Sequence, residues 1–252
     1  NIRLLTVERN YSSTPLVDFS GKWEESNPDS SRYFSAVAYS FAKYIHESLE
    51  VPVGIISSAW GGTPAEAWAE KSLLDEKFKP GLLKNNFKGQ YEHYNLGYLF
   101  NGMINPLIPY TIKGAIWYQG ENNRPRANNY SKLMQVMVES WRKEWGQGDF
   151  PFYFVQIAPY KYTEEIIDNH QSQLLRDSQR KALNQPNTGM VVTLDIGDFK
   201  NNLANGYGKQ FEQDGSWWEC EVKNDLCNGK GKIFFSDGSS YEGEFKDDKL
   251  NG

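Results

Sequence analysis

Short apolar runs alternate with longer amphipathic stretches throughout residues 1–198. The apolar runs predict strands, and they lie at residues 2–7, 53–56, 112–118, 152–157 and 190–194. Apolar side chains at helical spacing predict helices over residues 30–49, 96–107, 128–145 and 167–183. Strands that alternate with helices form a parallel sheet covered by helices on both faces. We therefore expect an α/β fold with a mainly parallel sheet over residues 1–198.

A second pattern begins after residue 198. A shift of 23 residues sets residues 199–216 over residues 222–239 with 11 identities in 18 positions. Each copy contains Asp-Gly between alternating polar and apolar residues, which is a strong sequence signal for a β-hairpin. A fixed period of this length is typical of stacked supersecondary units. We therefore predict a small antiparallel β-hairpin repeat segment over residues 199–252.

The charge and the cysteines exclude several classes of protein. The net charge of −5 gives no basic surface for nucleic acid, so we expect no nucleic-acid partner. Aromatic residues make up 15% of the chain, which suits sugar-binding surfaces as well as large core side chains. Cys220 and Cys227 are too few for a disulfide scaffold and their spacing matches no zinc site, although a single bridge between them stays open.

The loop over residues 57–68 follows a predicted strand and contains paired glycines. Gly61 and Gly62 allow close approach of the backbone to a ligand, and their N–H groups can donate to the oxyanion of a tetrahedral intermediate. Thr63 adds a hydroxyl next to them. The alternative is a tight strand-to-helix turn, with Pro64 near the start of the helix.

A second polar loop follows the strand at residues 112–118. Gln119 and Asn122 carry amides that can donate to an oxyanion, and Glu121 can orient donors or bind sugar hydroxyls. Gly120 lies between them. The alternative is a polar turn in which Asn122 acts as a cap.

A third loop, which follows the last predicted strand, contains two acidic residues. Asp195 and Asp198 follow residues 190–194, and an aspartate at a strand end can orient a catalytic histidine or cap a helix. Because parallel strands end at one edge of a sheet, ligands bind in the crevice beyond that edge, where the three loops are expected to meet.

Five stretches, taken together, resemble the sialate O-acetylesterase family, a branch of the SGNH-type hydrolases. They occur in the family's order and spacing over roughly 195 residues. The stretches are Phe19-Ser20-Gly21-Lys22-Trp23, Ser35-Ala36-Val37-Ala38-Tyr39-Ser40-Phe41-Ala42, Trp60-Gly61-Gly62-Thr63, Ile116-Trp117-Tyr118-Gln119-Gly120-Glu121-Asn122 and Asp195-Ile196-Gly197-Asp198.

The resemblance implies a three-layer α/β/α fold and serine-dependent hydrolysis of acetyl esters on a sugar, either sialic acid or a plant-type glycan. It implies no metal and no organic cofactor. On this basis the predicted catalytic residues are Gly62, Gln119, Asp195 and Asp198. The predicted substrate-binding residues are Gly61, Thr63, Gly120, Glu121 and Asn122.

Two parts of the family's catalytic machinery have no match in this sequence. The family uses a serine in a Gly-Gln-Ser-Asn phrase near its start and a histidine shortly after the Asp-Ile-Gly-Asp phrase, and neither is present. His46, His93 and His170 stand elsewhere, and we interpret them as structural. Residues 1–198 are thus expected to lack an N-terminal serine segment and a C-terminal histidine segment. Loss of one triad member lowers the rate by about 10⁴- to 10⁶-fold, so we expect the chain alone to be a poor esterase.

The phrase Tyr241-Glu242-Gly243-Glu244-Phe245 resembles a MORN repeat, a hairpin unit of scaffold and membrane-associated proteins. The resemblance covers residues 199–252, about two units, and implies that this segment docks to a membrane or a protein. The alternative to an esterase is therefore a non-catalytic carbohydrate-binding or scaffold protein. A third hypothesis is completion of the site by another polypeptide. The esterase part favours export to the periplasm or the extracellular space, and the repeats favour the cytoplasm.

Overall fold

The computed structural model describes residues 1–83, 91–159, 170–193, 205–211, 216–223 and 226–251. Six strands make up the sheet layer of the first part, as two three-stranded sheets with the orders β2-β1-β3 and β4-β5-β6. Neighbouring strands are parallel except for β2, which runs antiparallel to β1 at the edge. The strands are β1 (Ile2–Thr6), β2 (Trp23–Glu25), β3 (Val53–Ser57), β4 (Ala115–Tyr118), β5 (Phe152–Val155) and β6 (Thr188–Val191).

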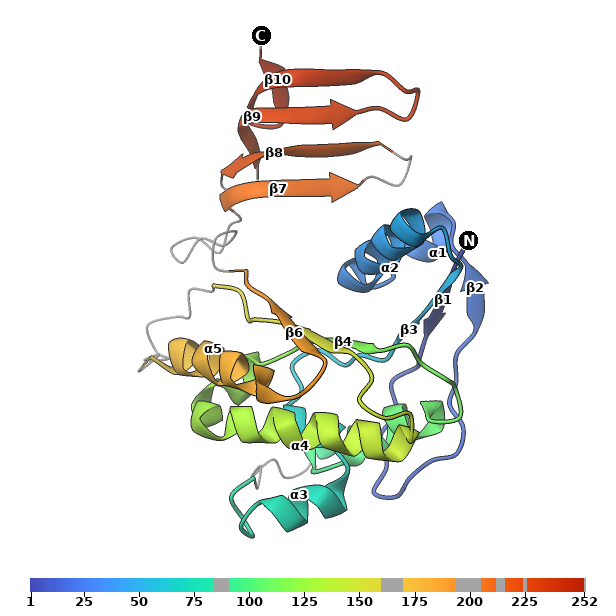
Figure 1. Ribbon diagram of the computed structural model, residues 1–252, viewed down its shortest axis with the longest axis vertical. Helices are drawn as coiled ribbons and strands as arrows, with labels where there is room; N and C mark the ends of the chain where they lie inside the picture. The colour runs from blue at the N-terminus through green and yellow to red at the C-terminus, as the bar shows by residue number, and fades with distance from the viewer. Residues whose placement is uncertain (84–90, 160–169, 194–204, 212–215, 224–225, 252) are drawn as a thin grey trace.

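Helices cover both faces of this sheet, which confirms the predicted α/β/α layers. Figure 1 shows α2 on one face and α4 with α5 on the other. The α-helices are α1 (Pro28–Ser31), α2 (Ala36–Leu49), α3 (Lys71–Lys77), α4 (Ala127–Trp145) and α5 (Gln171–Lys181). Short 3₁₀ turns occupy Ala65–Trp68, Glu92–Tyr94, Asn105–Leu107, Glu121–Arg126 and Ala182–Asn184.

The main core lies between α4 and the sheet. Tyr130, Leu133 and Met137 are almost completely buried on the inner face of α4, and Phe152 packs with them from the centre of the β4-β5-β6 group. A second, smaller core joins Ile2 and Leu4 of β1 to Ala42 of α2. The long helix is therefore the main support of the strands that carry the predicted polar loops.

One predicted helix has a different form. Residues 96–107 were expected to be α-helical, but they form a π-helix over Phe100–Ile104 followed by the 3₁₀ turn Asn105–Leu107. Pro106 lacks an N–H group, and the backbone carbonyls of Tyr98 and Asn101 accept from the N–H groups of Ser12 and Leu16. Contacts with a distant segment therefore compete with regular helical bonding. In the helix predicted over residues 167–183, the described part is α5, and residues 160–169 lie outside the described residues.

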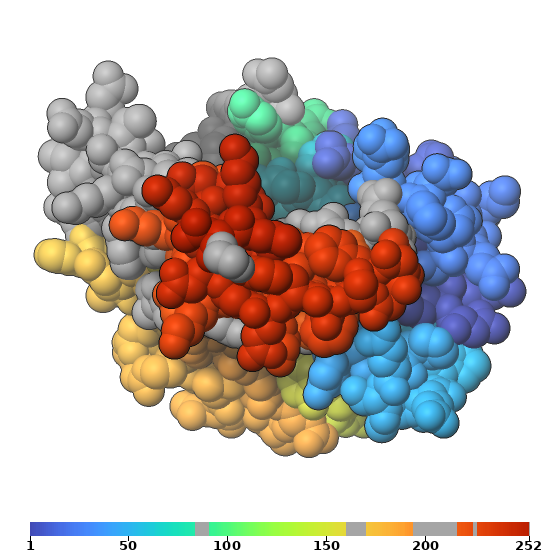
Figure 2. Space-filling view, turned by 90° about the horizontal axis from the view of Figure 1, so that it is seen from above, coloured from blue at the N-terminus to red at the C-terminus, as the bar shows by residue number. Residues whose placement is uncertain are grey.

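The repeat segment forms a five-stranded antiparallel sheet of order β11-β10-β9-β8-β7. The first residues of β8 and β10 are 217 and 240, a difference of 23, which agrees with the predicted period. Figure 1 shows these strands as a separate layer at one end of the long axis, and Figure 2 shows them in front of the α/β part. The strands are β7 (Asn205–Phe211), β8 (Trp217–Lys223), β9 (Leu226–Phe234), β10 (Ser240–Lys246) and β11 (Lys249–Asn251).

A disulfide joins two neighbouring strands of this sheet, β8 and β9. Cys220 of β8 and Cys227 of β9 form the bridge, with their Cα atoms 5.9 Å apart. Both side chains are buried with Phe245 of β10 in a small core of their own. The bridge that the sequence left open is therefore present.

Over the described ranges, no helix has the length and apolar character that a membrane span requires.

Candidate functional site

The loops that follow β3 and β4 meet at one edge of the sheet. The side-chain amide of Asn122 donates to the carbonyl oxygen of Gly62 over 2.7 Å. The side-chain amide of Gln119 donates to the carbonyl oxygen of Thr63 over 3.0 Å. Two side chains from one loop thus bind two successive carbonyls of the other, and this arrangement aligns the Gly61-Gly62 backbone beside Asn122.

The paired glycines form the open part of this edge. Gly62 has a φ of +76°, which is a left-handed conformation that glycine adopts without strain. A Cβ atom on Gly61 would meet no other atom within 4 Å. Neither of the two N–H groups donates to any other described residue. Gly61 and Gly62 therefore present an accessible backbone with two available donors.

Thr63 faces the interior. It is 3% exposed, its hydroxyl donates to the carbonyl of Trp60 over 2.7 Å, and it accepts from the indole of Trp68 over 2.9 Å. These contacts brace the glycine turn, and the predicted contact of Thr63 with substrate stays a prediction.

Gln119 is fully engaged inside the site. Its amide nitrogen donates to Thr63 and to the side-chain oxygen of Asn123, the latter over 2.7 Å. Its amide oxygen accepts from the hydroxyl of Tyr130 over 2.9 Å. Burial raises the pKa of Tyr130, so this hydroxyl stays protonated and remains a donor. Gln119 is thus placed to position the two loops, while its predicted contact with an oxyanion stays a prediction.

A buried charge lies directly under the loops. Glu66 is completely buried, and its carboxylate pairs with the guanidinium of Arg126 at 3.0 Å. The amide of Asn123 donates to the same carboxylate over 2.7 Å, and the oxygen of that amide accepts from the N–H of Ala65 over 2.9 Å. Asn123, which is not among the predicted site residues, therefore connects the backbone after β3 with the charge pair and with Gln119.

The remaining predicted residues occupy different positions. Gly120 has a φ of +156° and packs so closely against Ile157 that a Cβ atom would lie 2.7 Å from its methyl group. Glu121 is exposed at the start of the Glu121–Arg126 turn. The pKa of Tyr118 is raised mainly by burial and also by the negative charge of Glu121. The carboxylate of Glu121 therefore lies near the end of β4. Asp195 and Asp198 lie outside the described residues.

A group of aromatic side chains borders the glycine turn. We call Tyr11, Trp60, Tyr91, His93 and Tyr94 the aromatic cluster. The rings of Trp60 and His93 are stacked with their centroids 4.2 Å apart, and the hydroxyl of Tyr94 would lie 3.6 Å from a Cβ atom on Gly62. Burial lowers the pKa of His93, which favours its neutral form. No periodic pattern in the sequence marks this group, because its members come from three separate segments.

The other two histidines make local contacts away from this edge. His46 binds the amino group of Asn1 and the carbonyl of Val51 through its two ring nitrogens. His170 has a φ of +62° at the start of α5 and contacts Gln173 over 3.0 Å. These contacts agree with the interpretation of His46 and His170 as structural residues.

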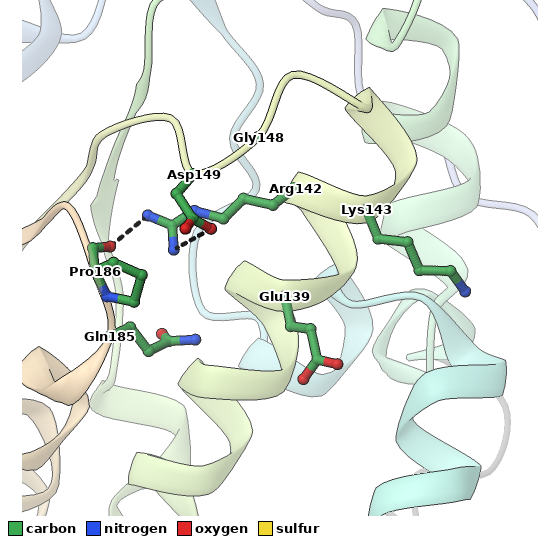
Figure 3. A pocket seen from close by; sticks show the side chains of 7 residues that line it. All are labelled: Glu139, Arg142, Lys143, Gly148, Asp149, Gln185 and Pro186. Atoms are coloured by element: carbon green, nitrogen blue, oxygen red, sulfur yellow. Dashed lines mark hydrogen bonds and ion pairs between the residues drawn. The ribbon is translucent and has the colours of Figure 1, made fainter.

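A cavity lies at the opposite end of the sheet. Figure 3 shows the side chain of Arg142 directed toward Pro186, whose carbonyl it binds over 2.8 Å. Arg142 also binds the carbonyl of Phe150 and pairs with Asp149. These residues precede β5 and β6, so the cavity is at the amino ends of the strands and does not belong to the candidate site. Across the parts of the chain that are described, no group of three His, Cys, Asp or Glu side chains gathers in a way that could hold a metal ion.

Comparison with known families assigns the two parts of the chain. A sequence profile described as carbohydrate esterase, sialic acid-specific acetylesterase, matches residues 20–205. The MORN repeat profile matches residues 196–216, 221–240 and 241–252, which is one unit more than the sequence analysis expected.

Similar proteins come from animals and bacteria. The chain is 28% identical over 223 residues to the sialate O-acetylesterase of Pongo abelii, covering 79% of this chain and 42% of that protein. It is 31% identical over 184 residues to the sialate O-acetylesterase of Homo sapiens, covering 66% of this chain and 34% of that protein. The chain thus spans less than half the length of these relatives.

Solved structures share the fold. A carbohydrate acetylesterase from Xanthomonas citri superposes with a TM-score of 0.67 at 27% identity, covering 96% of this chain and 62% of that one. A protein from Arabidopsis thaliana superposes with a TM-score of 0.51 at 18% identity, covering 80% of this chain and 72% of that one.

Proposed function

The chain belongs to the sialic acid-specific acetylesterase family of carbohydrate esterases, and from this premise we propose that the edge formed by the loops after β3 and β4 binds the acetyl ester of an O-acetylated sugar. Sialic acid is the proposed sugar, and a plant-type glycan is the alternative. Attack on an acetyl carbonyl places negative charge on its oxygen, and preorganised N–H donors stabilise that charge.

The observation that carries this proposal is the bond between Asn122 and the carbonyl of Gly62. It holds the glycine turn through the carbonyl oxygen of Gly62, while the N–H groups of Gly61 and Gly62 donate to no other described residue. Donors held in this way do not need to reorganise when charge develops, which is the condition for effective stabilisation of an oxyanion. Gly62 and Gly61 are therefore the proposed donors, and Gln119 and Asn122 hold them in place.

The proposed hydrolysis depends on groups beyond this edge. A hydroxyl becomes nucleophilic near neutral pH when a base removes its proton, and the family's serine and histidine have no match in this sequence. Glu121 is exposed at the edge and is proposed to contact sugar hydroxyls, together with Gly120 at the turn. Asp195 and Asp198 keep their proposed role of orienting a histidine. We propose weak or absent turnover by this chain alone, with binding retained.

The proposed division of the chain places the boundary near residue 198. In support, the two family profiles overlap only over residues 196–205, where the esterase match ends and the first repeat begins. The five-stranded sheet of the repeat segment favours a second candidate function, a carbohydrate-binding or scaffold protein that docks to a protein or a membrane through residues 199–252.

One experiment separates these functions. The purified 252-residue chain is titrated with O-acetylated N-acetylneuraminic acid and with the deacetylated sugar, and release of acetate is followed in parallel. We expect tighter binding of the acetylated sugar and a turnover below about 1 per second. Equal binding of both sugars would refute the ester site. Faster turnover would refute the proposed loss of catalysis, and tighter binding of the ester without any turnover would favour the binding protein.

A further inference from the structure

A cation, Arg9, lies beside the proposed ester site. Arg9 follows β1, is exposed, and holds its guanidinium 5.6 Å from the centre of the Trp60 ring. Within the described residues, no carboxylate lies at ion-pair distance from Arg9, and its guanidinium makes no hydrogen bond. An arginine over an aromatic ring keeps its full hydrogen-bonding capacity, because the contact uses the face of the guanidinium and leaves its edge free.

The partner of Arg9 is anchored to the proposed oxyanion loop. Trp60 immediately precedes Gly61, and its carbonyl accepts the hydroxyl of Thr63 inside the turn. The ring of His93 lies almost parallel to that of Trp60, with 11° between the planes. A group bound to the Arg9 guanidinium would therefore lie beside the turn that contains Gly61 and Gly62.

An exposed aromatic ring lies next to this cation. Tyr11 is two residues after Arg9 and 40% exposed, and its ring centroid is 6.4 Å from that of Trp60 and 6.0 Å from that of His93. The hydroxyl of Tyr11 contacts the carboxylate of Glu92 at 3.4 Å, which restrains the orientation of the ring. Aromatic side chains of this kind present a large apolar body with a polar end.

We propose that Arg9 and Tyr11 form a subsite for an acidic sugar, in which the guanidinium binds the sugar carboxylate and the ring of Tyr11 packs against the apolar face of the pyranose. The proposal rests on the proposed function, because the subsite lies beside the glycine turn that would receive the acetyl group. It adds a determinant of specificity: a sugar without a carboxylate loses the contact with Arg9. Arginine suits this role because its planar fork matches both oxygens of a carboxylate.

The test uses the whole chain and the methyl α-glycoside of N-acetylneuraminic acid, which carries no O-acetyl group. Binding of this sugar and of its methyl ester, in which the carboxylate is neutral, is measured by calorimetry or by ligand-detected NMR. Arg9→Gln removes the charge, and Tyr11→Leu removes the aromatic ring. Arg32→Gln is the matched control, because Arg32 is also exposed and lies 5.7 Å from the ring centre of Tyr33.

We expect Arg9→Gln to weaken binding of the acid on the order of tenfold and to leave the methyl ester unchanged, since a hydrogen bond to a charged group is at stake. Tyr11→Leu should weaken the acid and the ester equally, and Arg32→Gln should change neither. No binding of the acid by the unaltered chain, or equal binding by the Arg9→Gln variant, would overturn the subsite.

The outcome of this experiment does not depend on the proposed ester site. The probe has no acetyl ester, so its binding survives even if the chain neither recognises nor hydrolyses O-acetyl groups. Conversely, the chain could bind the acetylated sugar while Arg9→Gln leaves binding of the acid unchanged. That result would refute the subsite and leave the proposed function unaffected.

Discussion

The side-chain nitrogen of Asn122 lies 2.7 Å from the carbonyl oxygen of Gly62, and this bond ties together two loops that are 60 residues apart in the sequence. The bond uses the carbonyl of Gly62 and leaves its N–H free to face a ligand. The bond restrains the Gly62–Thr63 peptide, which directly follows the peptide that carries the N–H of Gly62.

Replacing Asn122 by Asp tests that orientation. A carboxylate cannot donate to the carbonyl of Gly62 and repels it, so the glycine turn should lose its fixed position. We expect binding of O-acetylated sialic acid to weaken on the order of tenfold, the effect of losing a hydrogen bond and leaving two acceptors opposed. Asn128→Asp introduces the same charge at an exposed position of α4 and should alter binding less than twofold. Equal effects of the two variants would show that charge alone is responsible.

The buried pair of Glu66 and Arg126 is expected to dominate the stability of the site. Arg126→Met leaves the buried carboxylate of Glu66 without its cation, which should reduce the free energy of unfolding by about 3 kcal/mol. Urea denaturation followed by tryptophan fluorescence measures this change. Arg180→Met breaks the exposed pair with Asp177 and should change it by less than about 1 kcal/mol. A loss below about 1 kcal/mol for Arg126→Met would mean that the carboxylate is solvated or protonated.

Gly120 is expected to tolerate no side chain. Gly120→Ala would place a Cβ atom 2.7 Å from Ile157 and 2.9 Å from Leu175, so the end of β4 would have to move away from α5. We expect a loss of about 3 kcal/mol or more in the free energy of unfolding, combined with displacement of Gln119. Gly148→Ala is the control, because Gly148 has a φ of +69° but open space around it, and should lose about 1 kcal/mol. Similar losses would indicate that backbone strain, rather than crowding, acts at both glycines.

His93 should make stability depend on pH. Burial lowers its pKa below the ordinary value of 6.5, so between the two values the unfolded chain binds more protons than the folded one. The free energy of unfolding should therefore rise with pH across that window and fall as the pH is lowered through 6.5. His93→Phe keeps an aromatic ring against Trp60 but cannot titrate. Its stability should vary less than that of the unaltered chain between pH 5 and pH 8 in thermal melts, and an unchanged pH profile would exclude His93 as the origin.

The sequence predicted the arrangement of the α/β part because apolar periodicity reflects burial directly. The strand at residues 152–157 and the helix at residues 128–145 correspond to β5 and α4, whose side chains form the main core. The meeting of Gly62 with Asn122 also follows from the sequence, since parallel strands end at the same edge of a sheet. The antiparallel repeats could also be predicted from the sequence, because many residues 23 positions apart are identical.

The roles of individual side chains depend on tertiary contacts that no local pattern encodes. Thr63 turns inward because the indole of Trp68 donates to it. The stacking of Trp60 on His93 joins residues from two different loops. The sequence left the disulfide open because the cysteines are seven positions apart in the chain, and the register of β8 and β9 places their Cα atoms 5.9 Å apart. The proposed roles of Asp195 and Asp198 remain predictions.

The two groups of strands in the α/β part have a consequence for how the molecule behaves in solution. Over the described residues, β3 pairs only with β1 and β4 pairs only with β5, so each has one edge whose peptide groups have no strand neighbour. Such edges are templates for another extended chain, and Tyr118 at the end of β4 is nearly half exposed. We therefore expect the molecule to self-associate through these strands at high protein concentration, and an added peptide able to pair with them should reduce this association.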